Sequence, residues 1–499
     1  MKKLRPIMFA GTGSEVGKSV IATAFCRIFL QDGYRPAPFK AQNMSLNSYA
    51  TAEDLEIGRA QAVQAEAARL ECHTDMNPLL LKPASDQMCQ VVLNGRPVGN
   101  QSAGEYFGRE RREDLRREVC AAFDRLEGLY NPIVMEGAGS LAEINLREAD
   151  LVNMSMAMHA GARVILVADI DRGGVFASVY GSVMLLTPRE RQYLAGVLIN
   201  KFRGDMRLFE PGVKMLEELC HVPVLGVIPY YDDIYVEEED SVSLRYKSRH
   251  ATAQGDGRVN VAVVSLAHMS NYTDFDVMER DRRVHLYYTD RAEEIRKADV
   301  ILIPGTKNTL YDLSELRRTG AARSISDAHS AGAAVIGICG GYQMMGLEVS
   351  DPYGMEGDLE RLPGLGLLPV VTRIGDVKLS RQASFSFLPS GGDCAQGYEI
   401  HMGQTWPEPG TAPSPLNRLE SGAGEGFFLN SRCFGSYMHG MLDNKAIVDY
   451  VLAPYAGKVS AGNGEAFDHA SFKDRQYDRL ADHVRSHVDM QRIYNILSV

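Results

Sequence analysis

The chain has 499 residues, of which 45% are hydrophobic and 23% charged. It is therefore too long for one ordinary domain, and its composition is that of a globular protein. It carries 53 Lys and Arg against 64 Asp and Glu, a formal net charge of −11. This acidic balance argues against a protein that binds nucleic acid or an anionic membrane surface. No run reaches the roughly 18 uninterrupted apolar residues of a membrane-spanning helix. The 8 cysteines include no C-x-x-C pair, which argues against a disulfide framework or zinc cluster and favours a reducing cytoplasm.

The first 235 residues are expected to form one domain of alternating strands and helices. Segments with helical spacing, such as 17–30 and 56–70, lie between short apolar runs. This alternation predicts a parallel sheet covered by helices on both faces. An acidic stretch that contains Ser and Gly, 236–257, is the expected linker to the next domain. The apolar runs expected to be strands are 6–10, 132–135, 162–168, 196–199 and 223–228.

A second α/β pattern occupies 258–450. Its Gly- and Pro-rich region, 352–426, is expected to contribute turns and antiparallel strands. Residues 451–499 form a tail, in which apolar residues at helical spacing over 471–497 predict a helix that docks on the body. The predicted fold class is α/β, with two doubly wound domains and mostly parallel sheets. The buried strands expected in the second domain are 259–266, 299–303 and 333–338.

A glycine-rich phosphate loop follows the first predicted strand. Residues 11–19 read Gly-Thr-Gly-Ser-Glu-Val-Gly-Lys-Ser, and a helical run follows them. The backbone N–H groups of Gly13 and Gly17 can turn toward phosphate oxygens, and the helix N-terminus adds partial positive charge. Lys18 can reach the β and γ phosphates, and the Ser19 hydroxyl can coordinate Mg²⁺. The motif predicts ATP and Mg²⁺ as cofactors. With threonine at the usual place of the first glycine, it resembles the dethiobiotin-synthetase type of P-loop.

Candidate ligands lie at or near the ends of further predicted strands. Glu136 is the expected second Mg²⁺ ligand, because a P-loop needs a carboxylate on a nearby strand; a solvated strand-end glutamate is the alternative. Ligands of open α/β sheets collect at the carboxyl ends of the strands. Asn200 is therefore a candidate for reading the adenine edge, and Asp169 a candidate near the phosphoryl group. Lys40 and Asn43 belong to a segment dense in amine and amide donors, which suits an acidic substrate or a transferring phosphoryl group. A polar surface loop is the alternative reading of that segment.

A cysteine in the second half carries the pattern of a nucleophile. Residues 333–346 read as a strand, then Gly-x-Cys-x-Gly, then a helix, which is the thiol version of the nucleophile elbow. Cys339 lies at the helix N-terminus, where the thiolate is favoured. The N–H of Gly340, together with backbone at Gly305, is the candidate oxyanion hole. A cysteine nucleophile needs a base, and His439 at a glycine-flanked strand end is the candidate. An inert core cysteine and a structural histidine are the alternatives.

These motifs, in this order, resemble the cobyric acid synthase family over essentially the whole chain. In the first half the resemblance rests on GTGSEVGKS, FKAQNMSLNS, EGAGSLAEIN and ADIDRGGVFAS. In the second half it rests on PGTKNT, GICGGYQMMG and SYMHG, which are similar to a class I glutamine amidotransferase. The resemblance implies a P-loop amidoligase domain followed by an amidotransferase domain.

The reaction that the resemblance implies is an ATP- and glutamine-dependent amidation in cobalamin biosynthesis. The b, d, e and g side-chain carboxylates of adenosylcobyrinic acid a,c-diamide would become amides, so glutamine and a corrinoid are the expected partners. The wider amidotransferase pattern carries a glutamate two residues after the histidine, where this chain has Met441. The resemblance therefore implies a Cys–His pair whose third, orienting group the sequence does not identify.

Other readings stay open. Cobyrinic acid a,c-diamide synthases share both halves of the pattern, and a pseudoenzyme would keep the second half for binding alone. A P-loop ATPase that switches other proteins is an alternative of another class. Partitioning ATPases of that kind carry a signature lysine at the position of Gly13, and this reading leaves Cys339 unexplained. The sequence predicts neither the order of amidation, nor the corrin-binding residues, nor the oligomeric state.

Overall fold

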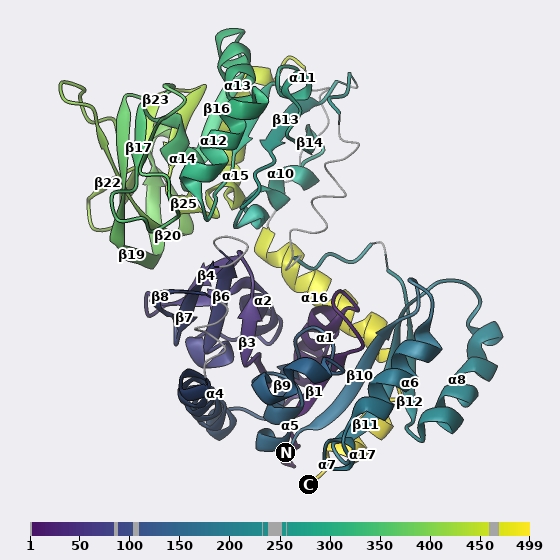
Figure 1. Cartoon of the computed structure of the whole chain (residues 1–499). Coiled ribbons are helices and arrows are strands. Elements are labelled where there is room, and N and C mark those ends of the chain that lie inside the picture. Colours follow the sequence, from purple (N-terminus) through teal and green to yellow (C-terminus); the bar gives the residue numbers. More distant parts are fainter. Residues whose placement is uncertain are drawn as a thin grey trace.

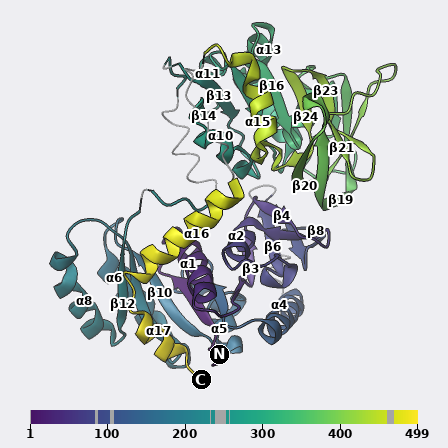
Figure 2. The same ribbon diagram turned by 180° about the vertical axis from the view of Figure 1, so that it is seen from behind.

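The computed structural model describes residues 2–83, 88–102, 109–231, 233–237, 252–255, 257–458 and 469–499. Most of the expected linker, 236–257, lies outside the described residues. The chain forms two lobes (Figure 1). The first lobe holds the N-terminal half and the C-terminal helices, and the second holds the residues between them. Seen from behind (Figure 2), helix α16 (His469–Arg485) runs along the first lobe, and its N-terminal end lies at the second.

A six-stranded parallel sheet forms the centre of the first lobe. The runs expected to be strands are all strands of this sheet, and β2 adds a sixth at its edge. Side chains alternate across the sheet along β1: Ile7 and Phe9 join the hydrophobic cluster on one face, and Met8 and Ala10 the cluster on the other. Both faces are therefore buried, as the apolar strands predict. In order across the sheet, the strands are β12 (Val224–Pro229), β11 (Leu194–Phe202), β10 (Arg163–Asp169), β1 (Ile7–Gly11), β9 (Ile133–Glu136) and β2 (Ala37–Phe39).

Helices cover both faces of this sheet. Residues of α1 (Lys18–Gln31), α16 and α17 (Met490–Leu497) join the cluster that contains Phe9. Residues of α4, α5, α6 and α8 join the opposite cluster. The remaining helical segments of this lobe are α2 (Arg59–Ala67), η1 (Thr74–Met76), α4 (Arg109–Leu129), η2 (Ile144–Ala149), α5 (Met154–Ala160), α6 (Val175–Leu185), α7 (Pro188–Arg191) and α8 (Met206–Cys220).

Two small sheets lie where the first lobe faces the second. The expected helix over 56–70 begins later than predicted, because Glu56–Gly58 is strand β5 and pairs with β4 (Ser48–Ala50). Cross-strand pairing overrides the helical spacing at these three residues, and α2 starts at Arg59. The four-stranded sheet consists of β3 (Gln42–Met44), β6 (Leu79–Pro83), β7 (Met88–Leu93) and β8 (Arg96–Ser102).

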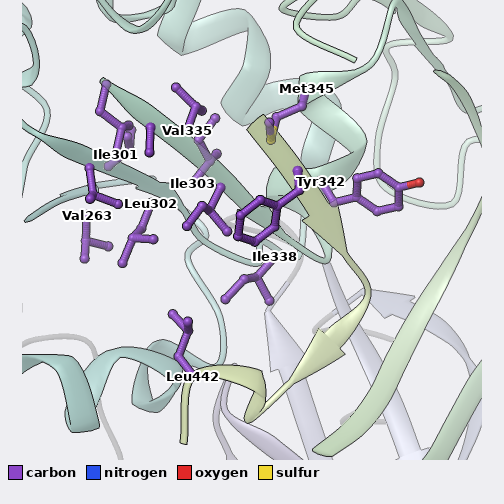
Figure 3. Close-up of a cluster of buried hydrophobic side chains, with 14 of the residues drawn as sticks. Val263, Ile301, Leu302, Ile303, Val335, Ile338, Tyr342, Met345 and Leu442 are labelled. Carbon is purple, nitrogen blue, oxygen red and sulfur yellow. The ribbon is translucent and has the colours of Figure 1, made fainter. Parts of the chain in front are cut away.

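The second lobe is built on another six-stranded sheet, parallel except for its edge strand β23. Figure 3 shows the centre of its core, where Leu302, Val335 and Ile338 gather between sheet and helices. Its strands, in order, are β14 (Val284–Thr289), β13 (Val259–Val264), β15 (Val300–Ile303), β16 (Ala334–Ile338), β24 (Cys433–Ser436) and β23 (Phe427–Asn430). Its helical segments are η3 (Tyr272–Phe275), α10 (Asp276–Arg280), α11 (Ala292–Ile295), α12 (Thr309–Thr319), α13 (Ala321–Ser330), α14 (Gly340–Met345), η5 (Met441–Asp443), α15 (Lys445–Leu452) and η6 (Ala453–Tyr455).

A mostly antiparallel sheet forms the other part of the second lobe, as the Gly- and Pro-rich region predicts. Its long hairpin of β19 (Val370–Phe387) and β20 (Asp393–Pro407) extends toward the first lobe (Figure 1). There the Gln382 side chain donates a hydrogen bond to the Ala50 carbonyl at 2.5 Å. The other segments are β17 (Glu348–Ser350), β18 (Arg361–Pro363), η4 (Leu388–Ser390), β21 (Asn417–Leu419), β22 (Gly424–Glu425) and β25 (Met438–His439).

The C-terminal tail contains two helices where one was expected over 471–497. The backbone of Val488 pairs with Gly226 beside β12 and interrupts the helix. Asp489 then starts α17, because its side chain accepts the N–H of Arg492 at 2.9 Å. Gly226 is required for this contact, since a Cβ there would lie 2.3 Å from the His487 carbonyl oxygen. The single-helix prediction is therefore wrong at 486–489.

Candidate active site

The phosphate loop joins β1 to α1 in the first lobe. Gly17 has a φ of 98°, a conformation that favours glycine, and the helix begins at Lys18. The Lys18 ammonium donates hydrogen bonds to the carbonyl oxygens of Gly13, at 2.9 Å, and Gly139, at 3.0 Å. This places the lysine over the loop, where a phosphate chain bound at the helix N-terminus would meet it.

Glu136 lies at the centre of a buried polar cluster beside this loop. Its Oε1 accepts hydrogen bonds from the Ser19 hydroxyl and the Lys40 ammonium, both at 2.8 Å, and its Oε2 accepts one from Gln64 at 2.6 Å. Mg²⁺ in nucleotide sites takes one or two protein oxygens and completes its shell with phosphates and water. The Ser19 hydroxyl and the Glu136 carboxylate fit such an ion in chemistry and position.

Asn200, Asp169 and Asn43 occupy different places around the loop. The Asn200 side chain donates to the Val16 carbonyl at 2.9 Å and packs against Gly17, so it braces the loop. The Asp169 carboxylate forms an ion pair of 2.9 Å with Lys201. Asn43 is buried and donates to Gln61 at 3.1 Å. The adenine role of Asn200 and the substrate roles of Lys40, Asn43 and Asp169 stay predictions.

A cavity of about 1050 Å³ connects this cluster with the second lobe. Its first-lobe wall includes Lys18, Lys40, Asn43 and Asn200. Its opposite wall is formed by residues of η3, α10 and β14, among them Tyr272, Asp276, Arg280 and Tyr288. The cavity is thus large enough for a nucleotide, and residues of both lobes line it.

The structure forms the expected elbow at Cys339, between β16 and α14. Cys339 has a φ of 51° and a ψ of −111°, a strained conformation that non-glycine residues keep mainly at functional sites. The turn is possible because its neighbours are glycines. A Cβ at Gly337 would lie 2.6 Å from the Tyr342 nitrogen, and one at Gly341 would lie 2.0 Å from the Ile303 oxygen.

His439 is buried beside this elbow and has an aspartate partner. Its Nδ1 lies 2.8 Å from Oδ2 of Asp274, whose Oδ1 accepts the N–H of Gly440 at 2.9 Å. Burial alone would lower the pKa of His439, but the Asp274 carboxylate and a hydrogen bond with the Cys339 thiol outweigh it and raise the pKa to about 10. Cys339, His439 and Asp274 thus have the arrangement expected of a nucleophile, a base and an orienting carboxylate.

Sequence reasoning missed Asp274. It lies in η3, 165 residues before His439, and no spacing rule connects the two positions. Asp443, which lies close to His439 in sequence, is partly buried, and burial together with the charge of Asp274 raises its pKa well above the ordinary value. The only sequence signal for Asp274 is an Asp-rich turn that follows the first predicted strand of the second domain.

The two expected oxyanion donors lie on loops that touch each other. A Cβ at Gly305 would lie 3.2 Å from Cε1 of His439, and one at Gly340 would lie 2.6 Å from Cγ2 of Thr306. A side chain at residue 340 would therefore collide with Thr306, and one at residue 305 would crowd the His439 ring. The backbone after β15 therefore packs against the backbone after Cys339, and the oxyanion role of Gly305 and Gly340 stays a prediction.

Comparison with known proteins adds the family. The family model of the CobQ/CobB/MinD/ParA nucleotide binding domain matches residues 7–243, and that of the CobB/CobQ-like glutamine amidotransferase domain matches residues 260–447. The phosphate loop lies in the first match, and Cys339, Asp274 and His439 lie in the second.

The similarity to curated relatives extends over the whole chain. A cobyric acid synthase of Bacteroides fragilis is 66% identical over 100% of this chain and 99% of its own. Those of Phocaeicola vulgatus and Syntrophobacter fumaroxidans are 64% and 47% identical, each over 100% of this chain and 99% of its own. With a phosphate loop in one lobe, a cysteine elbow in the other and this similarity from end to end, the chain belongs to the cobyric acid synthase family.

Proposed function

We propose that the protein uses ATP and glutamine to amidate the b, d, e and g side-chain carboxylates of adenosylcobyrinic acid a,c-diamide, a step of cobalamin biosynthesis. One observation carries the proposal: a single chain of this family combines a phosphate loop with a Cys339–His439–Asp274 site. Residues 1–235 are the amidoligase domain and 258–450 the amidotransferase domain, joined by the linker 236–257. Within the tail, 451–499, helices α16 and α17 pack on the first lobe, whereas 451–455 pack on the second.

The first lobe activates the acid. A carboxylate is a poor acyl donor, because its leaving group would be an oxide ion. Transfer of the γ-phosphoryl group of ATP to a carboxylate oxygen gives an acyl phosphate and ADP, and attack by ammonia then releases inorganic phosphate. Lys18 and Lys40 place positive charge beside the transferring group. Ser19 and Glu136 would hold Mg²⁺, which neutralises phosphate charge when bound.

The second lobe releases ammonia. The Cys339 sulfur attacks the γ-carbonyl of glutamine while His439 holds the thiol proton. The C–N bond breaks, the proton passes from His439 to the departing nitrogen, and a γ-glutamyl thioester remains. Water, deprotonated by His439, cleaves the thioester to glutamate and restores the thiol. Asp274 keeps the imidazole oriented and stabilises its charged form throughout.

Product analysis tests the substrate. The protein is incubated with ATP, Mg²⁺, glutamine and one of two corrinoids, adenosylcobyrinic acid a,c-diamide or cobyrinic acid. High-resolution mass spectrometry then counts the carboxyl hydroxyl groups that have been replaced by amino groups. We expect amidation at b, d, e and g of the a,c-diamide and none of cobyrinic acid at a and c. The reverse result would assign the chain to the a,c-diamide synthase reaction. ATP hydrolysis with no amide formed on either substrate would favour a P-loop switch protein.

A second measurement tests whether ammonia travels between the lobes without entering solvent. Glutamate dehydrogenase, added with 2-oxoglutarate and NADPH during turnover, consumes ammonia that escapes. We expect amidation to continue in its presence. Complete capture of the released ammonia would show that no sheltered path exists.

A further inference from the structure

A small cavity of about 40 Å³ reaches Cys339, and both lobes line it. Its charged residues are Lys82 of the first lobe and Lys307, Glu356 and Lys378 of the second. Glutamine bound with its carboxamide at Cys339 brings an α-ammonium and an α-carboxylate into the same space. Charged groups that leave water need partners of opposite charge, so the cavity must supply one cation and one anion.

Two of the three lysines already share an anion. Lys82 Nζ lies 2.6 Å from Oε1 of Glu56, and Lys378 forms an ion pair with Oε2 of the same carboxylate. Glu56 is fully buried, and Lys82 also donates to the Ser48 hydroxyl at 2.9 Å. These groups are held by the contact between the lobes.

Lys307 and Glu356 are bound differently. Within the part of the chain that the structure describes, the Lys307 ammonium has no hydrogen bond or ion pair. Glu356 accepts the N–H of Thr309 at 2.7 Å with Oε2, and its Oε1 accepts no hydrogen bond from the described residues. Burial lowers the pKa of Lys307 and raises that of Glu356 to about 7. In each group the charge of the other opposes the effect of burial and is outweighed by it, so the two groups lie near each other, yet no ion pair joins them in the described structure.

We propose that Lys307 binds the α-carboxylate of glutamine and Glu356 binds its α-ammonium, so that this pair selects an amino acid over a simple amide at Cys339. The proposal rests on the glutaminase function proposed above. It gives a role to the lysine of the PGTKNT loop, which the catalytic mechanism does not use. It also explains why the loop after β17 lies over the cavity, because that loop carries Glu356.

Two analogues of glutamine separate the two contacts. Glutaramate lacks the α-ammonium, and 4-aminobutanamide lacks the α-carboxylate. The experiment measures kcat/KM for ammonia release from glutamine and from each analogue, with the full-length protein and the variants Lys307→Met and Glu356→Gln. Each variant should lose about ten- to a hundredfold on glutamine, the range for a hydrogen bond to a charged group. Lys307→Met should leave 4-aminobutanamide unaffected, and Glu356→Gln should leave glutaramate unaffected.

Controls separate recognition from folding. Lys307→Arg, which keeps the charge, should retain most of the preference for glutamine over 4-aminobutanamide, and Lys214→Met on the exposed face of α8 should behave as the wild type. Amidation driven by added ammonium chloride should be unchanged in both cavity variants, which shows that they are folded. If kcat/KM falls by the same factor on all three amides in each variant, Lys307 and Glu356 do not recognise the α-carboxylate and α-ammonium, and the assignment is overturned. If wild-type protein releases no ammonia from any amide, the proposed function itself fails.

Discussion

The Asp274 carboxylate holds both the imidazole of His439, at 2.8 Å, and the backbone N–H of Gly440, at 2.9 Å. One side chain of the turn after β13 therefore fixes the ring and the strand end that carries it. The imidazole is also covered by Tyr398, whose ring lies 5.3 Å away at an interplanar angle of 24°. Its rotation is limited from two sides, which suits a base that must serve successive proton transfers.

Replacing Asp274 tests its orienting role. Asp274→Asn should lower kcat for ammonia release from glutamine by about 10²- to 10⁴-fold, as loss of an orienting carboxylate does in related triads. The KM for glutamine should change little, because Asp274 does not line the cavity at Cys339. Asp443→Asn is the matched control, since Asp443 lies close to His439 in sequence, is partly buried and undergoes the same change of side chain. Equal losses in both variants would argue against a specific role.

The ion pair of Asp274 and His439 predicts that the stability difference between the wild type and Asp274→Asn depends on pH. The pKa of His439 is raised to about 10, whereas an exposed histidine has a pKa of about 6.5. The stabilisation that the ion pair contributes is therefore complete below about pH 6.5 and is lost as the pH rises through about 10. Thermal unfolding of wild type and Asp274→Asn at pH 6, 8 and 10 should show a Tm difference that narrows with pH. A difference that widens would contradict the ion pair.

Cys339→Ser should separate the two half-reactions. The oxygen of serine is a far weaker nucleophile than a thiolate at neutral pH, so ammonia release from glutamine should fall to background. Amidation with ammonium chloride and ATP should persist, because the phosphate loop lies in the other lobe. Cys433→Ser is the matched control, as Cys433 is buried on the neighbouring strand β24, where it pairs with Val335. Unchanged ammonia release in Cys339→Ser would remove this residue from the mechanism.

The fold class, the phosphate loop and the cysteine elbow could be predicted because each depends on residues that are close together in the sequence. A strand, a glycine-rich turn and a helix follow one another within about 20 residues in both cases. The Asp274–His439 contact could not be predicted, since it joins segments 165 residues apart. Glu136 was placed at a strand end, but its contacts with Lys40 and Gln64 depend on how three elements pack.

The secondary-structure prediction was wrong where tertiary contacts oppose the helical spacing of the apolar residues. Glu56–Gly58 has the apolar spacing of a helix, yet it pairs with Ser48–Ala50 in the sheet that meets the second lobe. The tail keeps helical spacing through 486–489, yet the backbone pairing of Val488 with Gly226 interrupts it. In both places a partner distant in sequence decides the conformation.

The ion pairs of Glu56 with Lys82 and Lys378 predict that the contact between the lobes contributes to the stability of the protein. Burial would raise its pKa, but Lys378 and Lys82 outweigh burial and hold the pKa far below its usual range. Glu56→Gln removes the shared anion and leaves two buried ammonium groups facing each other, at a cost of about 3–5 kcal/mol. The Tm should fall well below that of Glu53→Gln, an exposed control in the turn that precedes β5. Adding Lys378→Met should recover part of the loss, and a purely additive double variant would show that the two residues are not coupled.

The packing of α16 on α1 predicts that the tail is part of the first lobe's core. Leu480 is fully buried in the cluster that contains Phe25 and Phe29, and the buried guanidinium of Arg27 in α1 forms an ion pair with Asp474. Leu480→Ala should therefore destabilise the protein by about 2–5 kcal/mol, through lost apolar burial and the cavity that remains. Arg475→Ala, at an exposed position of the same helix, should change the stability by less than about 0.5 kcal/mol. Because α1 begins at the phosphate loop, nucleotide added at saturating concentration should raise the Tm of both variants. A Leu480→Ala protein as stable as Arg475→Ala would mean that α16 is not packed on α1 in solution.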